Sequence, residues 1–390
     1  MTFADVAGPS LPYVVAAFVA AALVSFVLTP LVRRIAVRVD AVDHPDERRV
    51  NTIPIPRGGG VAVAAAFIAV VLGFTALNDQ LDFISLPTTI DLPSLIALLL
   101  GGALAAAFGV LDDYFDLRAR WQFAAQLVLA ALAIGLGVTI DFVSNPVSPE
   151  LIRLDGPFAV GFTVLWIVGM INSINFIDGL DGLSSGVVVI AAVTLGLISL
   201  SLITQPYVAV LCFALAGSLL GFLRYNFHPA SVFVGTSGVM FMGYTLAVLS
   251  ILGTAKIAVA LLVLAVPIID AFWIIVRRLA QGRSPFSPDR GHLHHRLLDV
   301  GLSHRQTVLL IYAICISLGA LSLLLSGAGQ VYAFLGVFVL IGLALFALSR
   351  IDLGGPADPD ERRDDARDEP PGQPQTQARA APTSQTSRSG

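Results

Sequence analysis

Long apolar runs, separated by short polar connections, occupy most of the chain. Each run approaches the roughly 20 residues that an α-helix needs to cross the hydrocarbon layer of a bilayer. Apolar positions do not alternate with polar ones, which excludes a transmembrane barrel, and backbone groups in lipid must pair within their own helix. The pattern therefore predicts an all-α integral membrane protein with about 11 transmembrane helices. The expected helices lie near residues 11–32, 58–77, 94–111, 121–140, 158–177, 183–203, 206–223, 237–253, 256–276, 307–326 and 330–349.

Composition agrees with a membrane protein and excludes other classes. Of the 390 residues, 56% are hydrophobic and 13% are charged, whereas soluble proteins carry about 25% charged residues. So few charges exclude a soluble globular enzyme, a disordered protein and a nucleic-acid-binding protein. The two cysteines, Cys212 and Cys315, lie in separate apolar runs and indicate neither a disulfide framework nor a metal site.

Arginine placement predicts the orientation of the helices. The connections over residues 33–57 and 277–306 are rich in arginine, and with eleven helices both fall on the same side of the membrane. Only Arg153 and Lys256 fall on the opposite side. Because basic residues mark the cytoplasmic side, we expect the N-terminus outside and the C-terminus in the cytoplasm.

The composition changes near the C-terminal end of the chain. Residues 354–390 are rich in Pro, Arg, Asp, Gln, Ser and Thr and contain almost no large apolar side chains. Such a segment cannot bury enough surface to offset the entropy lost on ordering. We therefore expect one polytopic domain over residues 1–353 and a disordered cytoplasmic tail over residues 354–390.

Three carboxylates cluster at the end of the third predicted helix. Asp112 and Asp116 are four residues apart and Asp113 and Asp116 are three apart, so a continuing helix would place them on one face. Neighbouring negative charges repel, and a divalent cation such as Mg²⁺, carried by a phosphate substrate, would relieve that repulsion. The alternative is a solvated helix end.

Polar residues recur at every third position where the fifth predicted helix ends. They are Asn172, Asn175, Asp178 and Asp181. On a helix this spacing makes one polar stripe, and polar groups at a membrane boundary are costly unless they line a cavity. The stripe therefore predicts a binding site, with a helix-packing patch as the alternative.

Histidines and arginine gather in the connection before the tenth predicted helix. His292, His294, His295 and Arg296 follow one another closely. Imidazole and guanidinium groups suit an anionic ligand, especially a diphosphate. The motif favours phosphate or sugar-nucleotide binding, and a transition-metal site or a solvated loop remain as alternatives.

Two weaker signals lie elsewhere. Arg57 precedes three glycines, Gly58 to Gly60, at the start of the second helix, where exposed amides suit phosphate but small residues also aid packing. Asp270 lies inside the ninth predicted helix. An intramembrane carboxylate is a functional candidate, although pairing with Arg277 would explain it equally well.

Together these motifs resemble those of the polyprenyl-phosphate N-acetylhexosamine-1-phosphate transferases, integral membrane enzymes of the glycosyltransferase 4 type. The resemblance extends from Asp43 to about Tyr312. Its stretch from Arg283 to Arg305 is similar to the WecA/TagO-like branch, and especially to actinobacterial members.

The resemblance implies a reaction and its partners. An N-acetylglucosamine 1-phosphate, or a related N-acetylhexosamine 1-phosphate, would pass from a UDP-sugar to polyprenyl phosphate, releasing UMP and starting a cell-envelope glycan on a lipid carrier. The implied cofactor is Mg²⁺, with Mn²⁺ as an alternative. The implied location is a bacterial plasma membrane with the active site on its cytoplasmic face. The expected partners are the two substrates and the bilayer, without nucleic acid, and a homodimer is left open.

The resemblance also implies roles for the residues above. Asp112, Asp113 and Asp116 would be catalytic, with Asp113 and Asp181 at the metal. Substrate binding would fall to Arg57, Asn172, Asn175, Asp178, His292, His294, His295 and Arg296.

Three positions depart from the family pattern. Thr236 stands where the family has an aspartate that binds Mg²⁺, Asn51 replaces a histidine, and Val239 replaces a small polar residue. A neutral hydroxyl is a weaker ligand for a hard dication than a carboxylate. A weakened or inactive paralogue that binds lipid phosphate or nucleotide is therefore an alternative to the transferase. A transporter is a remote one, because transporters place their polar residues near the bilayer midplane.

Overall fold

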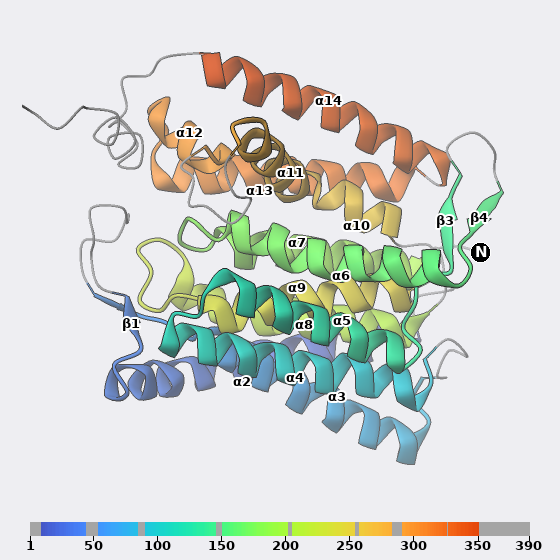
Figure 1. Cartoon of the computed structure of the whole chain (residues 1–390). Coiled ribbons are helices and arrows are strands. Elements are labelled where there is room, and N and C mark those ends of the chain that lie inside the picture. Colours follow the sequence, from blue (N-terminus) through green and yellow to red (C-terminus); the bar gives the residue numbers. More distant parts are fainter. Residues whose placement is uncertain are drawn as a thin grey trace, which may run out of the picture. The chain divides into compact units, whose positions relative to one another are not determined.

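The computed structural model is a bundle of helices that run alongside one another (Figure 1). It describes residues 9–43, 54–84, 90–145, 150–201, 205–253, 257–282, 291–325 and 327–350. The predicted tail over residues 354–390, Asn51 and Lys256 lie outside the described residues. The described helices all belong to one compact unit, Met1–Ile351.

All eleven apolar runs contain helix. In chain order the helices are α2 (Leu11–Arg38), α3 (Gly60–Leu81), α4 (Leu92–Phe115), α5 (Ala119–Gly135), α6 (Pro157–Ile177), α7 (Leu183–Ser201), α8 (Pro206–Asn226), α9 (Gly235–Leu252), α10 (Ile257–Val263), α11 (Ala265–Ala280), α12 (Leu293–Asp299), α13 (His304–Leu324) and α14 (Ala328–Arg350). Within the described part of the chain, 9 helices are long and apolar enough to cross a membrane, or 10 if α10 and α11 form one span. The helix α5, with 17 residues, is shorter. The prediction of a multi-pass helical membrane protein is confirmed.

The ninth predicted helix is not continuous, in contrast to the prediction. The axes of α10 and α11 differ by 77° at a break around Leu264. Pro267 explains the break, because proline has no N–H to donate to the carbonyl four residues earlier and its ring crowds that carbonyl. The short helix α12 was also not predicted, since it falls in the polar connection before α13.

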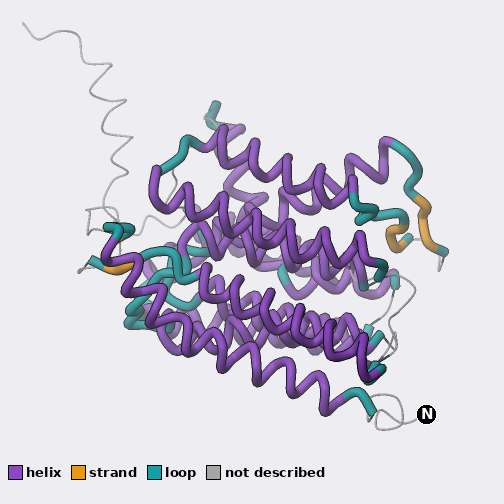
Figure 2. The backbone as a smooth tube through the Cα atoms, turned by 90° about the horizontal axis from the view of Figure 1, so that it is seen from below, coloured by secondary structure: helices purple, strands orange, loops and turns teal. Residues whose placement is uncertain are grey.

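Two short antiparallel strand pairs lie at opposite ends of the bundle (Figures 1 and 2). β1 (Val42–Asp43) pairs with β2 (Ile55–Pro56), and Val42 is opposite Pro56. β3 (Phe142–Ser144) pairs with β4 (Leu151–Arg153), and Val143 is opposite Ile152. The first helix begins at the β3–β4 end and α14 finishes at the β1–β2 end (Figure 1). An odd number of crossings, as the sequence predicts, gives this arrangement. That the β1–β2 end faces the cytoplasm stays a prediction.

The helices α7, α8 and α9 form the core, and 83% of the residues of α9 are buried. At its N-terminal end α9 contacts two neighbours closely through small residues. A Cβ atom at Gly60 of α3 would lie 2.0 Å from the Cα of Gly238, and one at Gly109 of α4 would lie 2.2 Å from the Cα of Ser237. Small residues of this kind let membrane helices approach closely. They bring the ends of α3, α4 and α9 together at the β1–β2 end.

Candidate active site

A cavity of about 520 Å³ opens at the β1–β2 end of the bundle, and we call it the polar cavity. It gathers several of the predicted site residues together with two of the positions that depart from the family pattern. These lining residues are Arg57, Asp113, Asn175, Asp178, Asp181, His295, Thr236 and Val239. Residues far apart in the sequence therefore converge here.

Asp113 binds the first turn of α9. Its carboxylate accepts the backbone N–H groups of Thr236, at 2.7 Å, and Ser237, at 3.1 Å. The first N–H groups of a helix have no partner within the helix and favour negative charge. Gly235 precedes them with φ +70°, and a Cβ atom there would lie 2.6 Å from an Asp113 oxygen. Only glycine fits at this position, so the Gly235-Thr236-Ser237 sequence holds Asp113 in place.

Asp178 lies in the turn after α6. Burial raises the pKa of Asp178 to about 7, against the effect of a hydrogen bond from the Ser184 hydroxyl. The charges of Asp113 and Asp181 raise this pKa further. Three carboxylates that repel one another in one cavity make a site suited to a cation.

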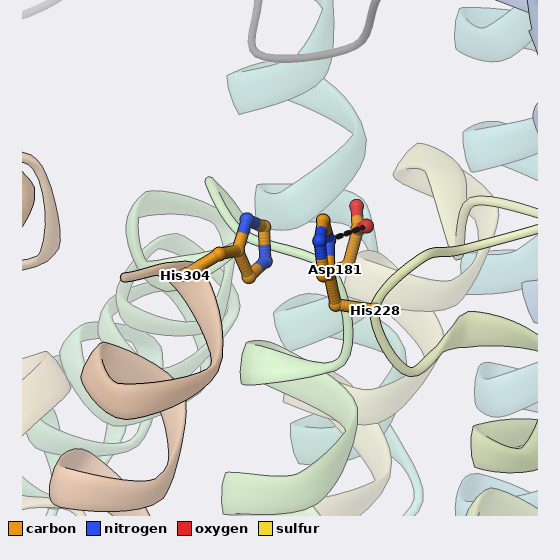
Figure 3. A group of neighbouring side chains, drawn as sticks. All are labelled: Asp181, His228 and His304. Carbon is orange, nitrogen blue, oxygen red and sulfur yellow. Dashed lines mark hydrogen bonds and ion pairs between the residues drawn. The ribbon is translucent and has the colours of Figure 1, made fainter. Parts of the chain in front are cut away.

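Asp181 binds the loop between α8 and α9. It accepts the backbone N–H of Ala230 at 3.0 Å and contacts Nδ1 of His228 at 2.8 Å. The ring of His304 stacks on that of His228, with 4.1 Å between the ring centroids (Figure 3). Neither His228 nor His304 was predicted, because each is a single histidine in a separate connection.

Asp112 and Asp116 lie outside the polar cavity, and the prediction of one shared acidic face is wrong. Asp112 is buried and accepts the Leu117 backbone N–H at 3.1 Å and the Gln122 side-chain amide at 2.8 Å, which fixes the turn into α5. Asp116 is exposed, with φ +51°. The helix α4 ends at Phe115, so Asp116 is not on its surface.

The histidine motif forms α12, and its members face different surroundings. His295 lines the polar cavity, whereas Arg296 donates to the Gly291 carbonyl at 3.1 Å. His294 is 2% exposed and packs against Gly179, where a Cβ atom would lie 2.1 Å from Nε2. Burial, and then the neighbouring histidines, lower the pKa of His294 well below its usual value. A neutral His294 thus acts as a packing group between α12 and the Asp178 turn.

Asp270 pairs with His292 and not with Arg277, the partner suggested by the sequence. Its carboxylate contacts Nδ1 of His292 at 2.8 Å and accepts the Leu293 backbone N–H at 2.8 Å. The two side chains are largely buried. Asp270 therefore fixes the start of α12 and the orientation of the His292 ring.

Two of the three glycines that follow Arg57, Gly59 and Gly60, pack and do not offer their amides to a ligand. The N–H groups of Gly59 and Gly60 donate to the carbonyls of Phe233 and Val234 at 2.9 and 2.8 Å. Arg57 itself forms an ion pair with Asp43 on β1. Of the two interpretations of this segment, packing is the one that the contacts support.

A second cavity, of about 900 Å³, runs between α5, α6, α10 and α11, and we call it the apolar groove. Most of its lining is apolar, including Phe162, Trp166 and Phe272, and the bend between α10 and α11 contributes both of its arms. One end is polar, and its residues are Gln126, Asn172, Asn175, Arg278 and His292. Asn172 donates to Gln126 at 2.7 Å. Asn175 lines both the apolar groove and the polar cavity, so the two spaces meet there.

Comparisons with known proteins show which proteins the chain is similar to. Residues 95–254 match the family described as glycosyl transferase family 4. A probable undecaprenyl-phosphate N-acetylglucosaminyl 1-phosphate transferase of Bacillus subtilis is 37% identical over 334 residues, which cover 84% of this chain and 89% of the relative. The decaprenyl-phosphate N-acetylglucosaminephosphotransferase of Mycobacterium leprae is 35% identical over 354 residues, covering 83% and 87%. An undecaprenyl-phosphate alpha-N-acetylglucosaminyl 1-phosphate transferase of Yersinia pestis is 29% identical over 327 residues, covering 81% and 84%.

Proposed function

The chain belongs to glycosyl transferase family 4, and on that basis we propose that it transfers N-acetylglucosamine 1-phosphate from a UDP-sugar to a polyprenyl phosphate. An oxygen of the lipid phosphate attacks the sugar-linked phosphorus of the nucleotide. The bond between the two nucleotide phosphates breaks, UMP leaves, and a polyprenyl-diphospho-sugar forms. We infer that the protein lies in a bacterial plasma membrane with the polar cavity on the cytoplasmic face, because the arginine-rich connections are predicted to lie on that side.

The junction at Asn175 is the observation that carries this proposal. A polyprenyl chain needs an apolar surface open to lipid, and a nucleotide diphosphate needs a polar site open to water. The apolar groove and the polar cavity provide these two surfaces and share Asn175. Phosphoryl transfer is catalysed mainly by alignment of the reactants and by neutralisation of charge. A junction of this kind supplies the alignment.

The family implies Mg²⁺, and the carboxylates of the polar cavity fit it. Mg²⁺ is commonly held by one or two carboxylates together with substrate phosphates. Asp113 and Asp178 would hold the ion, with Asp181 beside them, and their mutual repulsion favours a dication there. When bound, the ion would neutralise charge on the transferred phosphoryl group, and Mn²⁺ could occupy the same oxygen ligands. Arg57 and His295 line the same cavity and would contact the diphosphate.

A weakened transferase is the second candidate, and Thr236 is the reason for it. Thr236 lines the polar cavity, and its backbone N–H donates to Asp113, so position 236 adjoins the proposed cation site. A carboxylate at 236 would add a ligand that the hydroxyl cannot match. We expect Thr236→Asp to lower the Mg²⁺ concentration needed for half-maximal activity. Equal Mg²⁺ dependence in the wild type and the variant would contradict the proposal that Thr236 weakens binding of the ion.

The direct test is release of UMP by the purified protein. The reaction contains UDP-N-acetylglucosamine, polyprenyl phosphate and Mg²⁺, and controls omit one substrate at a time. We expect UMP only when both substrates are present, together with a lipid-linked sugar phosphate in equal amount. Folded protein that releases no UMP, with or without Thr236→Asp, would overturn the proposal.

A further inference from the structure

Three side chains at the rim of the polar cavity converge from segments far apart in the sequence (Figure 3). Asp181 follows α6, His228 follows α8, and His304 is the first residue of α13. One ligand atom from each lies within 4.8 Å of the other two. Among the described residues, this is the one group of three or more histidine, cysteine, aspartate or glutamate side chains with such spacing.

The local sequence fixes where each of the two histidines lies. Ser303 caps α13 by accepting the Gln306 backbone N–H, and the Gln306 side chain accepts the Ser303 backbone N–H at 2.9 Å. This capping box sets the start of the helix, and hence the position of His304. On the other side, Arg305 donates to the carbonyl of His228 at 3.2 Å, which joins the two histidine-bearing segments.

The His304 ring is poorly satisfied by hydrogen bonds. Both ring nitrogens are shielded from solvent, and neither makes a hydrogen bond of ordinary geometry with a described residue, although the Asp181 backbone lies close to the ring. Buried polar atoms are normally paired, since leaving them unpaired costs free energy. Because the ring lies against His228 and close to Asp181, a cation bound between the three side chains would supply a partner.

The ligand set selects the type of ion. Two imidazoles and one carboxylate suit Zn²⁺ and related transition metals, whereas Mg²⁺ prefers oxygen ligands only. The Ala230 backbone N–H donates to the Asp181 carboxylate and would orient it as a ligand. Asp181 and both histidines line the polar cavity, so a fourth coordination position would face the cavity and its water.

We propose that Asp181, His228 and His304 bind one Zn²⁺ ion, at a site separate from the Mg²⁺ position near Asp113 and Asp178. Zinc binding replaces the hydrogen bond between Asp181 and His228, and it draws the three ligand atoms closer together. The ion links the loop after α6, the loop after α8 and the start of α13. The bound ion therefore stabilises the wall of the polar cavity that these three segments form.

The test measures metal content and not turnover. The full chain, purified in detergent and stripped with EDTA, is equilibrated with Zn²⁺ in the presence of excess Mg²⁺, then desalted and analysed by mass spectrometry of the metal. We expect about one Zn²⁺ per chain in the wild type. His228→Ala and His304→Ala should each bind Zn²⁺ at least tenfold more weakly. His295→Ala is the matched control, because His295 lines the same cavity but is outside the trio, and it should keep the ion.

Two spectroscopic measurements identify the metal ligands directly, and the first needs only the wild type. X-ray absorption at the zinc edge of the wild type should show two imidazole ligands. Cobalt substitution should give visible absorption typical of low-coordinate Co²⁺, which His304→Gln removes. A wild type that retains no Zn²⁺, unchanged binding in both histidine variants, or a zinc edge without imidazole scattering would each overturn the proposal.

Discussion

Asp113 has a structural role in addition to the catalytic role that we propose for it. Its carboxylate accepts two backbone N–H groups at the start of α9, and it lines the polar cavity beside Asp178. The position of the negative charge is therefore set by the backbone of α9 and not by a flexible side chain. A carboxylate fixed in this way would hold a cation beside the transferred phosphoryl group without the cost of reorganisation.

Asp113→Asn tests the charge apart from the fold. The amide oxygen of asparagine can still accept an N–H group from α9, so we expect the variant to fold. We expect UMP release to fall by roughly 100-fold or more, the effect usually seen when a charge-stabilising group is lost. Asp82→Asn is a matched control, because Asp82 ends α3 in the left-handed conformation that asparagine tolerates. Full activity of Asp113→Asn would exclude a role for that charge.

Asp178 should make stability depend on pH. In the folded protein its pKa is raised to about 7 from the ordinary value of 3.8, so the folded state binds more protons than the unfolded state between these values. Stability is therefore highest below pH 4 with respect to this group, and it declines as the pH rises toward 7. The difference amounts to at most roughly 4 kcal/mol.

Thermal unfolding in EDTA between pH 4 and 8 measures this effect. Asparagine does not titrate, so Asp178→Asn should reduce the decline seen in the wild type. Adding Mg²⁺ should also reduce it, because the ion favours the charged carboxylate. Parallel pH profiles for the wild type and the variant would contradict the raised pKa.

At the scale of elements, α12 depends on Asp270 of α11 for its position. One carboxylate holds both the His292 ring and the Leu293 backbone N–H. Asp270→Asn weakens two charge-assisted hydrogen bonds, and each such bond contributes about 1.5–3 kcal/mol. We expect a lower unfolding temperature for this variant. Asp299→Asn, at the exposed end of α12, should leave it unchanged, and equal unfolding temperatures for the two variants would refute this role for Asp270.

A substitution in α6 tests whether the apolar groove binds the lipid substrate. A Cβ atom at Gly169 of α6 meets no atom within 4 Å, and Gly169 lines the groove. Gly169→Leu should therefore fill the groove without a clash. We expect the KM for polyprenyl phosphate to rise by about tenfold, which is about 1.4 kcal/mol, with little change in the KM for the UDP-sugar. Gly161→Leu, on the same helix and with equally open space at its Cβ position, is the control. An equal rise in the KM for polyprenyl phosphate in the control, or a change in the KM for the UDP-sugar alone, would contradict binding of the lipid in the groove.

The sequence predicts the helices better than it predicts the site. Hydrophobic runs locate every membrane helix, since length and apolarity are local properties. The bend between α10 and α11 was missed although Pro267 signals it, and Asp112 and Asp116 were grouped because the end of α4 was not foreseen. His228 and His304 could not be found from spacing, because only the packing of α7, α8 and α13 brings them together.

At the scale of the whole molecule, the chain returns to the same end of the bundle after every pair of crossings. The acidic turn after α6, the loop before α9, α12 and the start of α13 all contribute to that end. The opposite end carries the β3–β4 pair (Figure 1). The proposed chemistry would therefore take place on one side of the membrane, where a water-soluble nucleotide and a lipid phosphate could both arrive.

The structural role of Asp113 at the start of α9 also affects how related chains should be compared. A descendant without catalytic activity would still need a hydrogen-bond acceptor at position 113 to hold the start of α9, so selection for folding alone would keep aspartate or asparagine there. The presence of the aspartate is consequently a poor marker of an active enzyme. Position 236 is more informative. Its backbone N–H can donate to Asp113 of α4 whatever the side chain is, so folding does not restrict the side chain and its identity reflects selection for activity.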